Sequence, residues 1–281
     1  MKSTRVLHIS DLHFGRPAVL SQIDAVEDAI QRERFDVVAI SGDVSQRARI
    51  GEFQRAASFI RDARRVSRVI CVPGNHDVKW WESPLHLLGA DRMYATYRRY
   101  IDRDLEPVLR VEGCTFVGLN TAHGVALSTL TTRPRDVSII GALHPRQLEH
   151  ARLTFAAAPP GDTRIVVMHH NPLRGELSRR LGLTHASEIV RSFTRMGADL
   201  VLCGHDHQEA VDRVELDGRA IVVATAGTLS DRTRGGRPSS VHAITMSERD
   251  IKIVTRVWSS DARDFVPGPV SCFELSSRVS V

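Results

Sequence analysis

The first 73 residues alternate between short apolar runs and amphipathic runs, and this order restricts the fold more than any other feature of the chain. Residues 5–10, 35–41 and 67–73 have the length and the apolar character of buried strands. Between them, residues 18–34 and 51–65 carry apolar side chains at helical spacing. A strand–helix–strand–helix–strand order predicts a parallel sheet with helices on its faces.

The middle of the chain continues this alternation, and the last third changes character. Further elements are predicted as follows: mostly helix at 83–106, strands at 114–122, 164–170 and 198–204, helices at 144–158 and 184–196, and hairpins at 210–227 (around Asp217-Gly218) and 241–258. No linker separates these parts, so residues 1–281 are expected to form one domain. The predicted fold class is α/β, a four-layer α-β-β-α sandwich with two mixed sheets flanked by helices, in which the hairpins of 210–281 complete the second sheet.

Polar side chains follow five of the predicted strands, at the point where each strand ends. They are Asp11 and His13 after the first strand, Asp43 after the second, Asn75, His76 and Asp77 after the third, His169 and His170 at 164–170, and His205 and His207 at 198–204. In a parallel sheet the carboxyl ends of the strands share one edge, where ligands bind. Strand alternation would also place Asp11 and His13 on one side of the chain. Each motif alone is weak, but their joint occurrence predicts a shared site.

The residue types at this edge indicate metal binding. Carboxylate, imidazole and amide groups suit Mn²⁺, Fe²⁺/Fe³⁺ or Zn²⁺ better than Ca²⁺, which prefers sites made only of oxygen atoms. No thiolate is among them, which argues against a structural zinc finger. The candidate ligands at these five strand ends outnumber those that one metal ion needs, so two ions that share a bridging carboxylate are implied.

The order of the motifs resembles that of the calcineurin-like metallophosphoesterases. The matching blocks are Asp11-x-His13, Gly42-Asp43, Gly74-Asn75-His76-Asp77, His169, and Gly204-x2-His207 with His205, in that order over residues 11–207. The resemblance implies a dinuclear centre at the strand ends, with one metal on Asp11, His13, Asp43 and His207 and the other on Asp43, Asn75, His169 and His205. His169 is preferred to His170 because its His-x-Asn-Pro context resembles the family block. His76 would be the catalytic acid or transition-state stabiliser, and Asp77 would orient it.

The resemblance implies a metal-dependent phosphoester hydrolase in which a metal-activated hydroxide attacks phosphorus. The blocks are similar to those of the bacterial class III cyclic-nucleotide phosphodiesterases, a branch that also contains glycerophosphodiesterases. A cyclic nucleotide similar to cyclic AMP, or another small phosphodiester, is therefore the expected substrate. His76 stands where the lipid A pathway pyrophosphatases usually have Arg, and Val44-Ser45-Gln46 lacks the Tyr ligand of purple acid phosphatases.

Two alternatives stay open at this point. A DNA nuclease of the SbcD type has an opening motif similar to residues 7–15, and the isoelectric point of about 9.4 fits nucleic acid, but a net charge of +5 is modest for that role. An interaction module on the same fold would be expected to have lost ligands, and here none is lost. Trp80 and Trp81 either stack on a nucleobase or pack in a lid or dimer contact.

Composition adds little beyond the expected location. Four cysteines occur without a CxxC pair, which is typical of a reducing compartment. The N-terminus enters a strand at once, without the apolar region of a signal peptide, and no apolar run reaches the length of a membrane helix. A cytoplasmic protein without membrane contact is expected, and a homo-oligomer is left open. The loops at 80–106, 123–140 and 228–240 are expected to shape the pocket.

Overall fold

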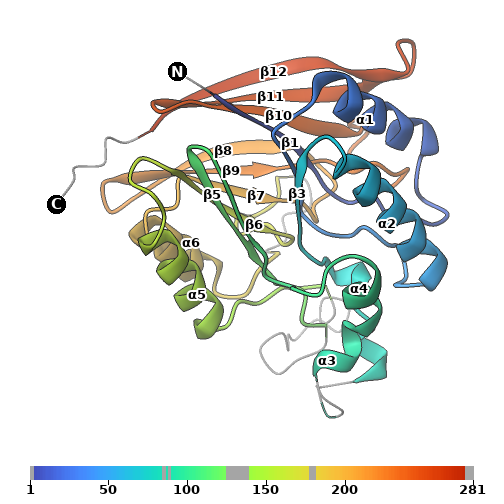
Figure 1. Cartoon of the computed structure of the whole chain (residues 1–281), viewed down its shortest axis with the longest axis horizontal. Coiled ribbons are helices and arrows are strands. Elements are labelled where there is room, and N and C mark those ends of the chain that lie inside the picture. Colours follow the sequence, from blue (N-terminus) through green and yellow to red (C-terminus); the bar gives the residue numbers. More distant parts are fainter. Residues whose placement is uncertain (1–2, 84–86, 88–89, 125–138, 177–181, 276–281) are drawn as a thin grey trace.

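The structure is a computed structural model that describes residues 3–83, 87, 90–124, 139–176 and 182–275. Two six-stranded sheets lie face to face, and helices cover the outer face of each sheet (Figure 1). The predicted α-β-β-α arrangement with two mixed sheets is confirmed.

The first sheet has the strand order β12-β11-β10-β1-β2-β3. Its N-terminal half contains β1 (Thr4–Ile9), α1 (Leu20–Glu33), β2 (Val37–Ile40), α2 (Ile50–Ala63) and β3 (Arg68–Cys71). These three strands run parallel, as the alternation of strand and helix predicts. The helices bury one apolar stripe each, which includes Ile23 and Ile30 on α1 and Phe53 and Ile60 on α2.

The second sheet has the strand order β4-β5-β6-β7-β9-β8. Its elements are β4 (Val108–Val111), β5 (Cys114–Leu119), α5 (Pro145–Ala156), β6 (Thr163–Met168), α6 (Ala186–Arg195), β7 (Leu200–Cys203), β8 (Ala210–Leu216) and β9 (Arg219–Thr225). Strands β5, β6, β7 and β9 are parallel, while β4 and β8 are antiparallel edge strands. Helices α5 and α6 cover the face that points away from the first sheet (Figure 1).

The C-terminal strands are divided between the two sheets, which corrects one expectation. The β8–β9 hairpin turns at Asp217 and Gly218, both with positive φ, and pairs within the second sheet. Strands β10 (Ser240–Met246), β11 (Asp250–Ser259) and β12 (Asp264–Glu274) instead form an antiparallel extension of β1 in the first sheet. Residues 210–281 therefore do not complete the second sheet alone, because β10 pairs with the free edge of β1.

The side chains of β1 illustrate how the layers are held together. Val6 faces the second sheet and packs in the core between the two sheets, whereas Leu7 and Ile9 face α1 and α2. His8 lies on the same side as Val6 and stacks on His242 of β10 at 5.6 Å between ring centroids. Because both faces of this strand are buried, its carboxyl end is rigidly placed for the residues that follow.

The segment expected to be mostly helical at 83–106 contains only two short helices in its described part. These are α3 (Ala90–Met93) and α4 (Ala95–Tyr100), while residues 84–86 and 88–89 lie outside the described residues. No helix in the described part of the chain is long and apolar enough to cross a membrane. All four cysteines are free, and Cys272 on β12 is exposed.

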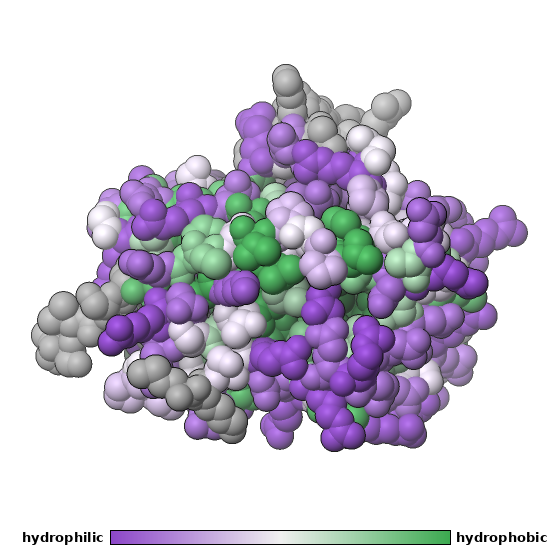
Figure 2. All heavy atoms as spheres, turned by 90° about the horizontal axis from the view of Figure 1, so that it is seen from above, coloured by the Kyte–Doolittle hydropathy of each residue, from purple (hydrophilic) through white to green (hydrophobic). Residues whose placement is uncertain are grey.

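Strand β12 forms one edge of the first sheet, and β3 forms the other. Seen from above in Figure 2, the molecule is largely hydrophilic, with hydrophobic side chains gathered near the middle of this face. Val270 of β12 is among the exposed large hydrophobic residues. A homo-oligomer stays a prediction, because nothing in the structure shows what would cover this edge.

Candidate active site

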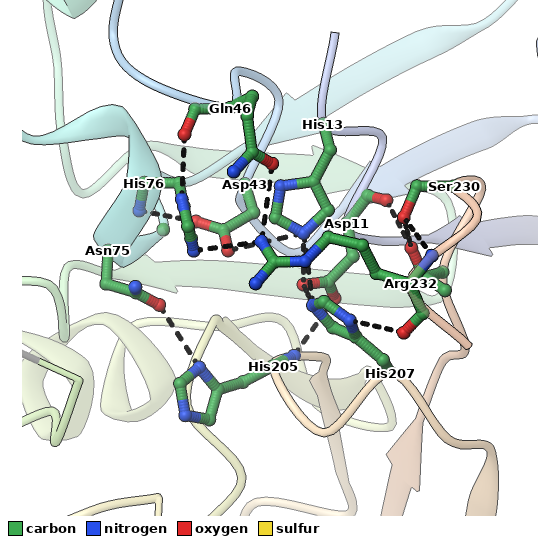
Figure 3. Close-up of polar contacts among 12 residues, drawn as sticks. Asp11, His13, Asp43, Gln46, Asn75, His76, His205, His207, Ser230 and Arg232 are labelled. Carbon is green, nitrogen blue, oxygen red and sulfur yellow. Dashed lines mark hydrogen bonds and ion pairs between the residues drawn. The ribbon is translucent and has the colours of Figure 1, made fainter. Parts of the chain in front are cut away.

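The seven predicted ligands come together beyond the carboxyl ends of β1, β2, β3, β6 and β7. Figure 3 shows Asp11, His13, Asp43, Asn75, His205 and His207 turned toward a common centre, and His169 contacts Asp43 from the second sheet. The first sheet contributes four of the seven and the second sheet contributes three, so the site lies where the edges of the two sheets meet.

Five of these residues have left-handed backbone conformations. The φ angles are 54° at Asp11, 46° at His13, 51° at Asp43, 71° at His205 and 53° at His207. Such conformations cost roughly 1–3 kcal/mol each outside glycine and concentrate at functional sites. The strand alternation used to pair Asp11 with His13 is therefore the wrong reason, because both residues lie beyond the end of β1. A left-handed turn, rather than extended backbone, aims both side chains into the site.

The loops approach each other so closely that glycine is required at two positions. A Cβ atom on Gly74 would collide with the carboxylate and backbone of Asp43. A Cβ atom on Gly204 would collide with Ser10 and the Asp11 carboxylate. The Gly-Asn-His-Asp and Gly-His-Asp-His motifs thus begin with a residue that lets two loops come into contact.

One cluster of the site consists of Asp11, His13, Asp43 and His207, whose ligand atoms lie within 4.8 Å of one another. Nε2 of His207 is 3.1 Å from Oδ1 of Asp11 and 3.0 Å from Nε2 of His13. Nε2 of His13 is 3.6 Å from Oδ1 of Asp11 and 3.8 Å from Oδ2 of Asp43. All four residues are buried.

The second cluster contains Asn75, His169 and His205. Oδ1 of Asn75 is 3.1 Å from Nε2 of His169 and 3.1 Å from Nδ1 of His205. The same Nε2 of His169 is 3.3 Å from Oδ2 of Asp43. Asp43 therefore lies between the two clusters, as a bridging carboxylate would.

The hydrogen bonds of two imidazoles show which ring nitrogen faces inward. Nδ1 of His207 donates to the backbone carbonyl of Arg232 at 2.9 Å, and Nδ1 of His169 donates to the carbonyl of Ser41 at 2.8 Å. Since a carbonyl only accepts, the hydrogen of each neutral ring is on Nδ1, and Nε2 presents a lone pair to a carboxylate oxygen. Such backbone partners are the usual means of orienting metal-ligating histidines.

In the neutral form of these rings, a carboxylate oxygen and an imidazole nitrogen that face each other in a buried space are both acceptors, and a cation, either a proton or a metal ion, would satisfy both. Oδ1 of Asp11 is buried and accepts no hydrogen bond, although two imidazole Nε2 atoms surround it. Two carboxylates, four imidazoles and an amide oxygen are a donor set that suits divalent ions. The residues present thus fit divalent metal binding, and the number and identity of the ions remain predictions.

The pKa shifts express the same demand for positive charge. Burial disfavours the imidazolium form of His169, but the charge and hydrogen bond of Asp43, with Asp11 and the Ser41 carbonyl, together outweigh burial and raise the pKa of His169 to about 9. At His207 burial is outweighed by the charge and hydrogen bond of Asp11 together with the Arg232 carbonyl and Asp43, so the pKa of His207 is raised. In His205, burial and the nearby His169 lower the pKa to about 3, so this ring is neutral and free to act as a ligand.

His76 lies beside the clusters, with both ring nitrogens occupied by other groups. Its Nδ1 donates to the carbonyl of Gln46 at 2.8 Å, and its Nε2 is 3.4 Å from Nη1 of Arg232. Its backbone N–H donates to Oδ1 of Asp43 at 2.8 Å. Burial, with further contributions from His13 and Arg232, lowers the pKa of His76. The ring therefore turns Nε2 toward the pocket, where a substrate would lie.

Asp77 does not orient His76 in the way that was expected. The Asp77 carboxylate accepts hydrogen bonds from the backbone N–H groups of Val44, Ser45 and Gly74 and from the Ser45 hydroxyl, at 2.7–3.2 Å. The His76 ring is held by the Gln46 carbonyl instead. Burial and the charge of Asp43 raise the pKa of Asp77 to about 6. The role of Asp77 is to tie the loop after β2 to the loop after β3, and it acts on His76 only through that loop.

Asp77→Asn is expected to lower the free energy of unfolding by at least about 2 kcal/mol, because an amide group would place its own donors against two of the four donors that now bind Asp77. For a chain of this size this corresponds to a drop in Tm of roughly 4–8 °C. Thermal unfolding monitored by circular dichroism checks the result, with the exposed Asp261→Asn as a matched control. A Tm equal to that of the control would show that the four hydrogen bonds do not stabilise the loop.

His170 lies closer to the site than strand alternation implies. The rings of His169 and His170 have centroids 4.9 Å apart, and both contact His205, at 5.1 and 4.6 Å. Nδ1 of His170 pairs with the Thr121 hydroxyl at 2.8 Å, and its Nε2 is buried without a hydrogen-bond partner. The two rings are therefore not sent to opposite sides, and the choice of His169 as the ligand stays a prediction.

A pocket of about 770 Å³ opens beside His76 and Asn75. Its wall contains residues 46–49, residues 78–82, Ile139 and Arg232. Trp80 is half-buried against the core that includes α1 and α2, whereas Trp81 is 50% exposed. The expected loops at 80–106 and 228–240 both reach this pocket, but most of the third loop, 125–138, lies outside the described residues.

Sequence reasoning missed Arg232 and Gln46, which meet over His76 in Figure 3. Nη1 of Arg232 is 3.3 Å from Oε1 of Gln46, across 186 residues of sequence. Neither residue belongs to a motif with metal-ligand spacing, and a single sequence carries no signal that would connect them. The carbonyl of Arg232 also holds His207, so this residue joins a predicted ligand to the pocket.

Comparison with known proteins agrees with this geometry. A family model described as calcineurin-like phosphoesterase matches residues 4–209. Comparison with curated proteins finds no match. Among solved structures, a purple acid phosphatase from yellow lupin (Lupinus luteus) seeds has a TM-score of 0.69 at 10% identity over 97% of this chain and 54% of its own. This chain thus spans about half the length of the lupin protein.

Two further solved structures extend the comparison. GAP50, described as the anchor in the inner membrane complex of Plasmodium, has a TM-score of 0.62 at 13% identity and is covered over 90% of its length, with 99% of this chain. A phosphoesterase described as uncharacterized from Streptococcus pneumoniae has a TM-score of 0.47 at 13% identity, with coverage of 98% of this chain and 99% of its own. At these identities the likenesses to the lupin protein and to GAP50 show the fold alone.

Proposed function

Because the chain belongs to the calcineurin-like phosphoesterase family, we propose that it is a metal-dependent phosphodiesterase that hydrolyses small nucleotide phosphodiesters, with cyclic nucleotides as the first candidates. The family supports metal-dependent phosphoester hydrolysis in general. The observation that supports a diester is the pocket of about 770 Å³ beside His76, which has room for an organic group on one side of the Asp/His centre.

The residues of the centre would divide the work as follows. Divalent ions held by the two clusters would supply positive charge to the phosphoryl oxygens and lower the pKa of a water molecule. Asp43 would connect the clusters, because its Oδ2 lies 3.8 Å from Nε2 of His13 and 3.3 Å from Nε2 of His169. The backbone carbonyls of Ser41 and Arg232 keep His169 and His207 turned inward.

His76 would assist the departing oxygen of the diester. Its Nδ1–H is engaged by the Gln46 carbonyl, so Nε2 is the atom that can hold a proton toward the substrate. A negatively charged phosphodiester next to the ring favours the protonated form. The Arg232 guanidinium, 3.4 Å from the same Nε2, would bind a non-bridging phosphate oxygen.

A substrate panel on protein reconstituted with Mn²⁺ tests this function. It contains bis-p-nitrophenyl phosphate, p-nitrophenyl phosphate, cyclic AMP, a glycerophosphodiester and linear DNA. We expect the aryl diester to be hydrolysed faster than the aryl monoester, cyclic AMP to be turned over well above the aryl diester, and all turnover to stop in EDTA. Faster hydrolysis of the monoester than of every diester would contradict the proposal, and cutting of DNA without cyclic AMP turnover would favour the nuclease alternative.

Trp81→Ala gives a second test that separates a nucleotide from a generic diester. Base stacking on an exposed aromatic ring is worth about 1–3 kcal/mol per base, so KM for cyclic AMP should rise by roughly tenfold or more. The KM for bis-p-nitrophenyl phosphate should change much less. Trp81 is chosen over Trp80 because Trp80 packs against the core and its removal would also affect folding. Equal effects on both substrates would contradict a stacking role for Trp81.

One comparison supports a second candidate function, that of a non-catalytic interaction module. GAP50, which shares this fold, is described as an anchor in a membrane complex. An interaction module that kept the seven ligands would bind metal without hydrolysing any phosphodiester. The same panel decides between the two functions, because full metal content without turnover of any member would favour the module.

A further inference from the structure

We infer that the pocket beside His76 is a subsite for a second anionic group of the substrate, which makes the preferred substrate a nucleotide with a further phosphate on the leaving-group side. The inference rests on the proposed function for the position of the scissile phosphate. It adds a specificity that the Asp/His centre does not contain, and it assigns roles to Arg47 and Arg49.

The wall of the pocket carries an excess of positive charge. Arg47, Arg49, Lys79 and Arg232 line it, together with the single carboxylate of Glu82. Lys79 is paired with Glu82 at 3.3 Å. Within the described residues, no carboxylate lies at ion-pair distance from the guanidinium groups of the three arginines. Three cations without a protein counter-charge around one cavity favour an anionic ligand.

The arginines stand on a loop that is fixed on both sides. Oε2 of Glu52 accepts the backbone N–H groups of Arg47 and Arg49 at 2.8 and 3.2 Å. Between them, Ala48 is fully buried with φ of 50°, and its N–H donates to the Ser45 hydroxyl at 3.2 Å. The loop is therefore held at the N-terminus of α2, where the helix dipole adds to the positive potential.

The same loop is joined directly to the catalytic side of the pocket. The Gln46 carbonyl accepts Nδ1–H of His76, and the Gln46 side chain accepts from Arg232 at 3.3 Å. The arginines that follow Gln46 thus continue the wall that begins at His76 and Arg232. A substrate whose scissile phosphate lies at the Asp/His centre would extend its leaving group along residues 46–49.

A simple cyclic nucleotide carries one negative charge, which Arg232 and the Asp/His centre are sufficient to bind. Arg47 and Arg49 then have no anionic partner, although both are exposed and line the same pocket. A second phosphate provides that partner, and arginine binds phosphate with paired hydrogen bonds. Trp81, which is 50% exposed and lines the same pocket, would stack on the base of such a nucleotide.

The test compares two ligands that differ by one phosphate. Thymidine 5′-monophosphate and thymidine 3′,5′-bisphosphate are titrated calorimetrically into Mn²⁺-loaded protein. Two exposed charge pairs correspond to about tenfold in Kd, so the wild type should bind the bisphosphate roughly tenfold or more tightly than the monophosphate. The Arg47→Gln/Arg49→Gln variant should reduce this preference to less than about threefold. The charge-matched control Arg110→Gln/Arg219→Gln, with both side chains exposed outside the pocket, should keep the preference.

Each result has one meaning. Equal Kd values for the two ligands in the wild type, or a preference that survives in Arg47→Gln/Arg49→Gln, would overturn the subsite. An octathymidylate that binds more than about 100-fold more tightly than the bisphosphate, through the same arginines, would overturn the small-substrate inference in favour of a nucleic-acid groove. Absence of diester hydrolysis, with the Kd preference intact, would overturn the proposed function and leave the subsite standing.

Discussion

Asp43→Asn is expected to lose at least one of the two predicted metal ions and to lower kcat/KM for bis-p-nitrophenyl phosphate by about 10³-fold or more. The reason is its position, with Oδ2 facing Nε2 of both His13 and His169 and Oδ1 accepting the N–H of His76. Asparagine keeps the size of the side chain and tolerates the φ of 51°, so the change removes charge with little effect on the backbone. A neutral amide cannot bridge two cations as a carboxylate does.

Metal content measured by mass spectrometry after reconstitution with Mn²⁺ and desalting provides the readout that does not depend on activity. The wild type and the exposed-site control Asp261→Asn should retain the same amount of metal, and Asp43→Asn should retain less. If Asp43→Asn kept the full metal content, the bridging role of Asp43 would be refuted. Full metal content with lost activity would instead place Asp43 in the orientation of His76 through its hydrogen bond to the backbone.

His76→Ala is expected to keep the wild-type metal content and to lower kcat by about 10²–10⁴-fold, the usual contribution of a general acid. Its ring nitrogens face Gln46 and Arg232 rather than the two clusters, so metal binding should not depend on them. The effect should be smaller for a substrate with a good leaving group, such as p-nitrophenolate, than for a dialkyl diester, because less proton donation is needed.

The comparison of leaving groups makes the role of His76 specific. A structural defect would reduce the hydrolysis of all diesters by the same factor, whereas loss of a proton donor would reduce the dialkyl diester most. His185→Asn is the matched control, since His185 is exposed and its φ of 52° is tolerated by asparagine. Loss of metal in His76→Ala would show that His76 is a ligand and would contradict the assignment.

The two variants probe different layers of the site, and their combination is informative. Asp43 belongs to the charged clusters, while His76 belongs to the wall shared with Gln46 and Arg232. If the assignments hold, metal content separates the two variants and the leaving-group dependence identifies the second. The subsite variant Arg47→Gln/Arg49→Gln should then behave differently from both, since it changes selectivity between ligands.

Much of the architecture could be predicted because it depends on local patterns. The alternation of apolar and amphipathic runs predicted β1 to β3 with α1 and α2, since buried strands and amphipathic helices have different periods. The sheet to which β10, β11 and β12 belong could not be predicted in this way. A hairpin pattern indicates which strands pair with each other, but it does not indicate which sheet edge is free to receive them.

The candidate site divides in the same manner. Residues 11 to 207 carry their metal-ligand chemistry in short motifs at strand ends, so the sequence by itself determined which side chains could meet at one edge and which family the chain resembles. Only the tertiary structure decided the hydrogen bonds of Asp77, Gln46 and Arg232 and the place of Arg47 and Arg49 in the wall of the pocket. Their contacts depend on left-handed turns and on segments up to 186 residues apart, and such distances in sequence carry no local periodicity that a single chain reveals.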